Sequence, residues 1–128
     1  MAKELVKFLK SLKVGSAKPI LVGHNIDSFD IPLLDDFLSF FGEDLSKYVC
    51  TDFTIDTLWW SRVMFEESEN YKLGTCCKNV GIEVINAHRA LNDTIANREL
   101  IKKMISNMRG FGGSIEKKEK RFRETFEI

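Results

Sequence analysis

The chain has 128 residues, a hydrophobic content of 44% and a formal net charge of zero. These values are typical of one globular domain near the small end of the usual size range. No apolar run approaches the roughly 20 residues that span a bilayer, and no signal peptide precedes Lys3, so we expect a soluble, cytoplasmic protein without a membrane segment. Three cysteines, an odd number without the spacing of a disulfide framework or a zinc site, indicate buried apolar thiols: Cys50, Cys76 and Cys77.

Charge is unevenly distributed along the chain. Residues 1–18 carry a net charge of +4, whereas residues 27–70 carry a net charge of −9. The acidic segment has the charge to attract cations, but solvated helix faces have the same composition, and we favour that interpretation for the segment as a whole.

The first predicted elements are a helix and a strand. Residues 3–13 have apolar side chains on one side and lysines on the other, which predicts an amphipathic helix. The short unbroken apolar run at residues 20–22 is typical of a strand buried on both faces of a parallel sheet. This strand places His24 and Asn25 at its carboxyl end.

A second helix and a second strand follow. Pro32 suits the first turn of a helix that Gly42 ends. Alternating apolar side chains over residues 48–55 predict the strand, and Asp56 then has the position of a cap for a third helix. A shorter helix is expected over residues 72–80. This order of helix, strand, helix, strand and further helices predicts an α/β domain with parallel pairing.

The last predicted helix, residues 90–108, carries a carboxylate on its apolar side. Asp93 shares a stripe with Leu100 and Met104, seven and eleven residues further on. A carboxylate on the buried side of a helix is costly unless a hydrogen bond, a cation or a metal ion compensates it. His88, five residues before Asp93, is a candidate for the same site.

A change in composition at Gly110 suggests two regions, a domain over residues 1–109 and a charged C-terminal tail over residues 110–128. Glycine and serine at residues 110–114 are typical of a flexible joint, and the run at residues 117–123 has a net charge of +4. Such a run has the charge to contact phosphates, although a solvated helix or a disordered end is the more common case.

Two segments resemble motifs of the DEDDh (DnaQ-like) exonucleases. Residues 22–34 place Asn25 before an aromatic-Asp pair that ends at Asp30, as in the second motif of that family. Residues 87–93 match its third motif, H-x-A-x-x-D, with His88 and Asp93 at the defining positions. Between them lie segments similar to two further landmarks of the family, at residues 56–58 and 72–82. The order and spacing agree over about residues 4–108.

The resemblance implies a ribonuclease H-like fold and hydrolysis of nucleic-acid 3′ ends by two divalent ions, Mg²⁺ or Mn²⁺. By position, Asp30 and Asp93 would bind these ions and His88 would deprotonate the attacking water. His24 and Asn25 are the candidate substrate-binding residues. Alternatives remain for three of these residues: Asp30 at a helix N-terminus, His24 as a structural histidine at a strand end, and Asn25 as a turn residue.

One motif of the family is absent from these 128 residues. The D-x-E pair should lie on a strand that precedes everything described above, within a three-stranded meander. We therefore expect a partial ribonuclease H-like fold, helix-rich and with a short parallel sheet that lacks its first three strands. Two of four metal-binding carboxylates are missing, so we expect weak metal binding and a chain that is inactive or nearly so by itself.

The missing strand would neighbour the strand at residues 20–22, and the resulting open edge invites pairing with another chain. A homodimer, a larger assembly or a missing N-terminal segment would complete the sheet. Two functions follow: the C-terminal part of a 3′-to-5′ exonuclease, or a non-catalytic nucleic-acid-binding or assembly module derived from that family. The residues do not distinguish DNA from RNA, or proofreading from repair or RNA maturation.

Overall fold

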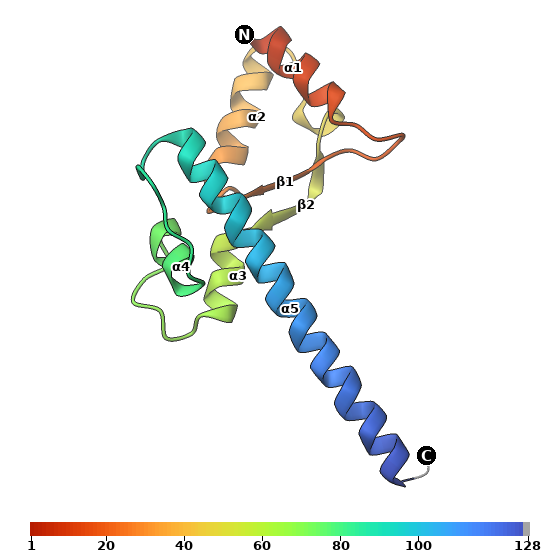
Figure 1. Ribbon diagram of the computed structural model, residues 1–128. Coiled ribbons are helices and arrows are strands. Elements are labelled where there is room, and N and C mark those ends of the chain that lie inside the picture. The colour runs from red at the N-terminus through yellow and green to blue at the C-terminus, as the bar shows by residue number, and fades with distance from the viewer. Residues whose placement is uncertain (127–128) are drawn as a thin grey trace.

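The computed structural model describes residues 1–126, and it describes side chains through residue 110. Figure 1 shows α1 and α2 at one end of the molecule, with the strands between them and α3, and α4 beside α3. Helix α5 runs past the strands and α3 and extends beyond them to the opposite end. The elements in chain order are α1 (Ala2–Ser11), β1 (Ile20–Gly23), α2 (Asp30–Phe40), the short 3-10 helix η1 (Leu45–Lys47), β2 (Cys50–Asp56), α3 (Thr57–Met64), α4 (Leu73–Asn79) and α5 (Ala90–Phe126). The helix-rich α/β arrangement predicted from the sequence is confirmed.

The two strands pair in parallel, as predicted. Their register matches Ile20 with Cys50 and Gly23 with Asp56, with an irregularity in between. Because the carboxyl ends of both strands lie at the same edge, the loop after β1 and the start of α3 meet there. This edge positions the candidate site.

The other edge of β1 has no partner strand among the described residues. Ile20 and Val22 are 45% and 43% exposed, so the prediction that this strand is buried on both faces is wrong for the structure. The physical reason is that no strand within the described residues pairs with this edge, so these side chains stay partly exposed. Half-exposed apolar residues on an unpaired edge agree with the expected lack of neighbouring strands.

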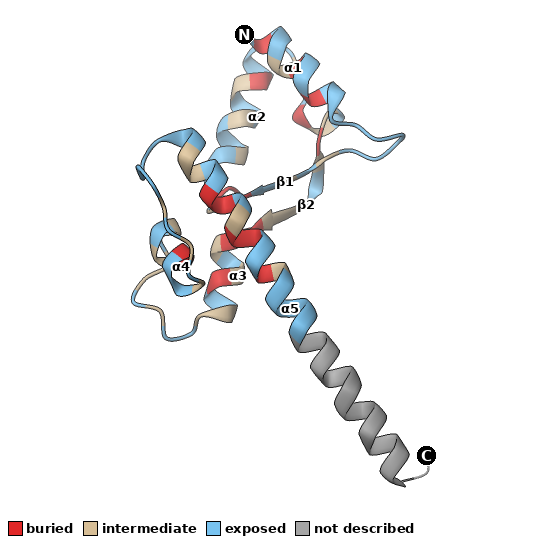
Figure 2. Cartoon of the chain, viewed as in Figure 1, coloured by how far each residue is buried: buried red, intermediate tan, exposed pale blue. Residues whose placement is uncertain are grey.

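Two apolar clusters stabilise the ends of the molecule. One joins α4 to α5, and the other joins α1 to α2, η1 and the residue before β2. Figure 2 shows the buried residues of α5 on the stretch that crosses the sheet and α3. The buried members of the first cluster are Cys76, Cys77, Ala96, Leu100, Ile101 and Met104. The buried members of the second are Val6, Leu9, Leu38, Leu45 and Val49.

All three cysteines are free thiols. Cys76 and Cys77 are fully buried, which confirms their expected role as small apolar residues, whereas Cys50 is half-buried.

Helix α5 continues without a break through residues 110–114, the segment whose glycines suggested a flexible joint. The side chains of the basic run at residues 117–123 lie outside the described residues. The division at residue 109 and a contact of this run with phosphates therefore stay predictions. Within the described part of the chain, no helix has the length and apolar character needed to cross a membrane.

Candidate active site

Asp56, the last residue of β2, is a buried carboxylate with three backbone donors. Its Oδ1 accepts hydrogen bonds from the backbone N–H of Leu58 at 3.0 Å and of Asn25 at 2.8 Å. Its Oδ2 accepts the backbone N–H of Asp27 at 3.2 Å. The first bond caps α3 as predicted from the sequence. The other two hold the loop that leads from β1 to Asp30.

That loop has an unusual backbone at Asn25, where φ is +62°. Asparagine adopts this left-handed conformation more readily than most residues do, because its short polar side chain bonds locally. The bond from its N–H to Asp56 keeps the chain in this turn. A third bond, from the Thr54 hydroxyl to Asp27 Oδ1 at 2.6 Å, also ties this loop to β2.

Thr57, the first residue of α3, is a fully buried hydroxyl at the centre of a polar network. Its Oγ1 lies 2.9 Å from His24 Nδ1 and 3.1 Å from the Gly23 carbonyl oxygen, both at the end of β1. Asn97 of α5 donates its side-chain N–H to the same Oγ1 at 2.8 Å. One hydroxyl thus joins β1, α3 and α5.

His24 is held on both ring nitrogens. Its Nε2 lies 2.6 Å from the carbonyl oxygen of Tyr71, and since a carbonyl only accepts, Nε2 carries the proton of this bond. Its Nδ1 lies 2.9 Å from the Thr57 hydroxyl oxygen, which is the second polar contact of the ring. These contacts match the structural interpretation of His24, and they fix the orientation of a ring that also lines the cavity described next.

A cavity of about 550 Å³ opens between β1, α2 and the start of α5. Asp30, the first residue of α2, and Asp93, in the first turn of α5, both line it. His24 and Asn97 contribute to its wall, and most of the remaining lining is apolar. The structure therefore brings together the two carboxylates that the sequence singles out as metal ligands.

The two carboxylates differ in their surroundings. Asp93 is half-buried, and its Oδ1 accepts the backbone N–H of His88 at 3.3 Å. This hydrogen bond is one of the compensating interactions that we expect for a carboxylate on the apolar side of a helix. Asp30 is exposed, and among the described residues its carboxylate has no hydrogen bond or ion pair.

His88 and Asn25 do not line the cavity. His88 lies in the turn before α5, with an exposed side chain and a φ of +72°. The side chain of Asn25 is also exposed. Only His24, Asp30 and Asp93, of the five predicted site residues, share the cavity.

The donor set fits part of a divalent metal site. Carboxylate oxygens are the ligands that Mg²⁺ and Mn²⁺ prefer. Within residues 1–110, whose side chains are described, no three His, Cys, Asp or Glu side chains are grouped so that they can hold a metal ion. The described residues therefore do not complete a metal site by themselves.

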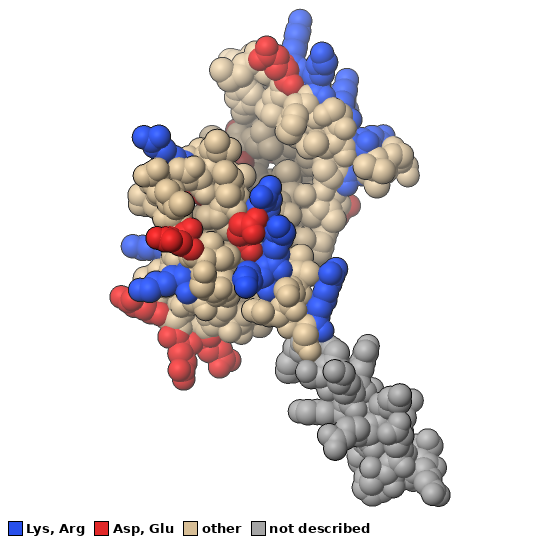
Figure 3. All heavy atoms as spheres, in the orientation of Figure 1, with Lys and Arg blue, Asp and Glu red and all other residues tan. Residues whose placement is uncertain are grey.

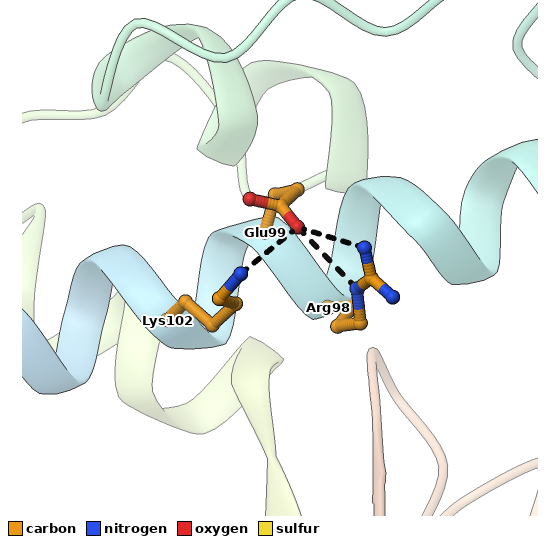
Figure 4. A network of polar contacts seen from close by, with 3 residues as sticks. All are labelled: Arg98, Glu99 and Lys102. Atoms are coloured by element: carbon orange, nitrogen blue, oxygen red, sulfur yellow. Dashed lines mark hydrogen bonds and ion pairs between the residues drawn. The ribbon is translucent and has the colours of Figure 1, made fainter.

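The solvent side of α5 carries a separate group of charges. Glu99 contacts Lys102 at 3.4 Å and Arg98 at 3.2 Å (Figure 4). Lys102 lowers the pKa of the Glu99 carboxyl, and the hydrogen bond from Arg98 adds to the effect. Exposed pairs of this kind contribute little to stability, and this group faces away from the buried stripe of α5.

The sequence did not identify Thr57 or Asn97 as site residues. It also did not indicate that Asp56 holds the loop after β1 through the N–H groups of that loop. The sequence did contain a signal for Asn97, because it is a polar residue among the apolar residues Ala96 and Leu100 of the predicted helix. A polar side chain on a buried helix face needs a hydrogen-bond partner. Thr57 lies in the family landmark at residues 56–58, but that landmark did not indicate its contacts with His24 and Asn97.

A profile of the RNase T family, described as Exonuclease, matches residues 3–101. The chain belongs to this exonuclease family. The match confirms the DnaQ-like resemblance and the ribonuclease H-like superfamily. The two-stranded parallel sheet with its helices is thus a partial ribonuclease H-like fold. Exonucleases of this kind generally use divalent metal ions.

Similar proteins are PolC-type DNA polymerases III of bacteria. The chain is 34% identical over 107 residues to the DNA polymerase III PolC-type of Bacillus cereus, which covers 84% of the chain. It is 32% identical over 106 residues, 83% of the chain, to the corresponding protein of Bacillus subtilis. The matched region spans 7% of the length of each of these two relatives. No solved structure matches the chain.

Proposed function

We propose that the chain carries half of a DEDDh active site for 3′-to-5′ hydrolysis of DNA or RNA ends. The observation that carries this proposal is the shared cavity of Asp30 and Asp93, which come from helices far apart in the sequence. The motif positions of both residues and the family membership of the chain support it.

Each candidate residue has a role in this proposal. Asp30 and Asp93 are two of the four carboxylates that hold Mg²⁺ or Mn²⁺ in a complete site, and bound divalent ions supply charge stabilisation at the scissile phosphate. His88 accepts a proton from the attacking water, which suits an imidazole at neutral pH. His24 and Asn25 orient the terminal nucleotides. For His88, this role requires the turn before α5 to bring the ring to the cavity.

The remaining two carboxylates come from a D-x-E strand that pairs along the open edge of β1. The strand belongs to a segment outside these 128 residues. A second copy of the chain in a homodimer can pair with this edge, but it carries no D-x-E motif and cannot supply these two carboxylates. The half-exposed Ile20 and Val22 support pairing at this edge. The 128 residues alone are then inactive or nearly so, and the complete protein acts in the cytoplasm.

The test is a nuclease assay on 5′-labelled single-stranded DNA and RNA with Mn²⁺ or Mg²⁺. We compare the chain alone with the chain fused to the D-x-E strands of a DEDDh relative, both after gel filtration with light scattering. The fusion should shorten the labelled strand stepwise from its 3′ end, and Asp30→Ala or Asp93→Ala should reduce the rate at least about 100-fold, since each removes a charge from the reacting centre. Asp52→Ala, at an exposed carboxylate of β2 outside the cavity, is the matched control.

Two outcomes would contradict the proposal. If the fusion folds but shows no metal-dependent hydrolysis, the cavity is not an active site. Hydrolysis by the chain alone that survives Asp93→Ala would point to another mechanism or to a contaminant.

The second candidate function is a non-catalytic nucleic-acid-binding or assembly module. The observation in its favour is that the side chains described, those of residues 1–110, include no group of three that could bind a metal ion. It predicts that the natural coding sequence upstream of Met1 lacks an in-frame D-x-E strand. A dimer in light scattering without nuclease activity would support an assembly role.

A further inference from the structure

A second cavity, of about 430 Å³, lies between α1 and the turn after α2. Asp30 begins α2 and Phe41 follows its last residue, so this cavity and the Asp30–Asp93 cavity lie at opposite ends of that helix. Figure 3 shows Lys and Arg side chains along the edge of the molecule that α1 forms. The lining consists of lysines on α1 over a buried apolar floor, with one aromatic and one acidic side chain opposite.

Three lysines face this cavity from one side of α1. Lys3, Lys7 and Lys10 are spaced four and three residues apart, which places them on one helical face. All three are exposed, and none forms an ion pair within the described residues. Their ammonium groups are thus available to an anionic ligand.

Glu43 is the acidic residue of the lining, and it already has a partner. Its carboxylate accepts a hydrogen bond from the Tyr48 hydroxyl. The ammonium group of Lys10 lies 5.8 Å from the centroid of the Tyr48 ring. Three lysines against one engaged carboxylate leave the cavity with a positive field.

Phe41 adds an aromatic surface beside these charges. Its side chain is 52% exposed although it lines the cavity. The ring is supported by edge-to-face contacts with Phe37 and Phe40, each with ring centroids 5.2 Å apart. A supported, half-exposed aromatic ring beside lysines is the combination that binds single strands, because ammonium groups contact phosphates and the ring stacks on a base.

We propose that this lysine–Phe41 cavity binds single-stranded nucleic acid. Lys3, Lys7 and Lys10 contact consecutive phosphates, and Phe41 stacks on an unpaired base. The site needs no metal ion and does not depend on hydrolysis in the Asp30–Asp93 cavity. An acidic protein segment would use the lysines but would gain no stacking, so the aromatic residue decides between the two ligands.

Fluorescence anisotropy with a labelled ten-nucleotide oligothymidylate, in EDTA, tests this site on the 128-residue chain. Lys7→Gln should weaken binding several-fold and make the slope of log K against log salt shallower by about 0.7. Lys13→Gln removes the same charge from outside the cavity and is the matched control. Phe41→Ser should weaken binding about fivefold or more through lost stacking, whereas Phe53→Ser, at a ring that is 55% exposed on β2 and lies outside the cavity, should not.

Circular dichroism of each variant checks that it is folded. If Lys7→Gln and Lys13→Gln weaken binding equally, the oligonucleotide binds to positive charge spread over the surface, and the proposal is wrong. Binding that is unaffected by Phe41→Ser, with equal competition by polyglutamate, would assign the cavity to an acidic protein segment instead. Because the anisotropy is measured in EDTA, without metal ions and without hydrolysis, failure of this proposal and failure of the nuclease proposal are separate results.

Discussion

Asn97 of α5 donates its side-chain N–H to the hydroxyl oxygen of Thr57 at 2.8 Å, and both side chains are buried. Within the described residues this is the side-chain hydrogen bond that links α5 to α3. Asp93 lies four residues before Asn97, so the two share a face of α5 and both line the Asp30–Asp93 cavity. The contact therefore sets the position of Asp93 relative to the end of β1.

The first prediction concerns this contact. Asn97→Ala removes a donor from a buried hydroxyl, and we expect a loss of about 1–3 kcal/mol in the free energy of unfolding, measured with urea. Asn107→Ala, at an exposed position of the same helix, is the control and should stay within about 0.5 kcal/mol of the original chain. Equal stability of the two variants would mean that the contact contributes nothing.

The second prediction concerns Asp56. Asp56→Ala should cost about 2–4 kcal/mol in the free energy of unfolding, because α3 loses its cap and the N–H groups of Asn25 and Asp27 lose their acceptor. NMR should show the amide signals of both residues shift. Asp44→Ala removes an exposed cap from η1, and its cost should stay near 1 kcal/mol. If Asp56→Ala and Asp44→Ala lower the free energy of unfolding by similar amounts, Asp56 acts only as a helix cap.

The third prediction concerns thiol chemistry. Burial raises the pKa of the Cys77 thiol to about 11, and Cys76 and Asp93 add to the effect. Because the thiolate is the reactive form, iodoacetamide at pH 8.5 should label Cys50 in the folded chain and spare Cys77 until urea is added. Mass spectrometry of peptides identifies the labelled sites. Rapid labelling of Cys77 without denaturant would contradict its burial.

The same pKa gives a pH dependence of stability. The unfolded thiol ionises near its ordinary pKa of 9.0, whereas the folded one retains its proton to about pH 11. The stability that this group contributes is therefore complete below pH 9 and decreases as the pH rises towards 11. Urea titrations of the original chain and of Cys77→Ala should differ in slope within this range. Parallel curves would show that Cys77 ionises equally in both states.

The fourth prediction concerns the cluster between α4 and α5. Leu100 is fully buried, and Leu100→Ala should cost about 2–5 kcal/mol through lost apolar contact and the cavity left behind. Leu91, on the same helix, is 71% exposed, so Leu91→Ala should change stability by no more than about 0.5 kcal/mol. Thermal unfolding followed by circular dichroism compares them, and equal midpoints would place Leu100 outside the core.

Local patterns predicted most of the fold. The alternation at residues 48–55 and the apolar run at residues 20–22 correspond to β2 and β1, because strands follow from side-chain periodicity within a few neighbours. The cap at Asp56 was also predictable, since capping depends on residues two or three positions apart. The burial of β1 was not, because it depends on which strands lie beside it.

By itself the sequence determined the order of elements, the family motifs and the choice of Asp30 and Asp93 as candidate ligands, all of which depend on residue type and short spacing. Only the tertiary structure decided that these two carboxylates share one cavity while the His88 side chain lies outside it. Only the structure, too, placed the Thr57 hydroxyl between His24 and Asn97. The reason is physical: a hydrogen bond between distant segments depends on how whole elements pack, and packing is a property of the assembled chain.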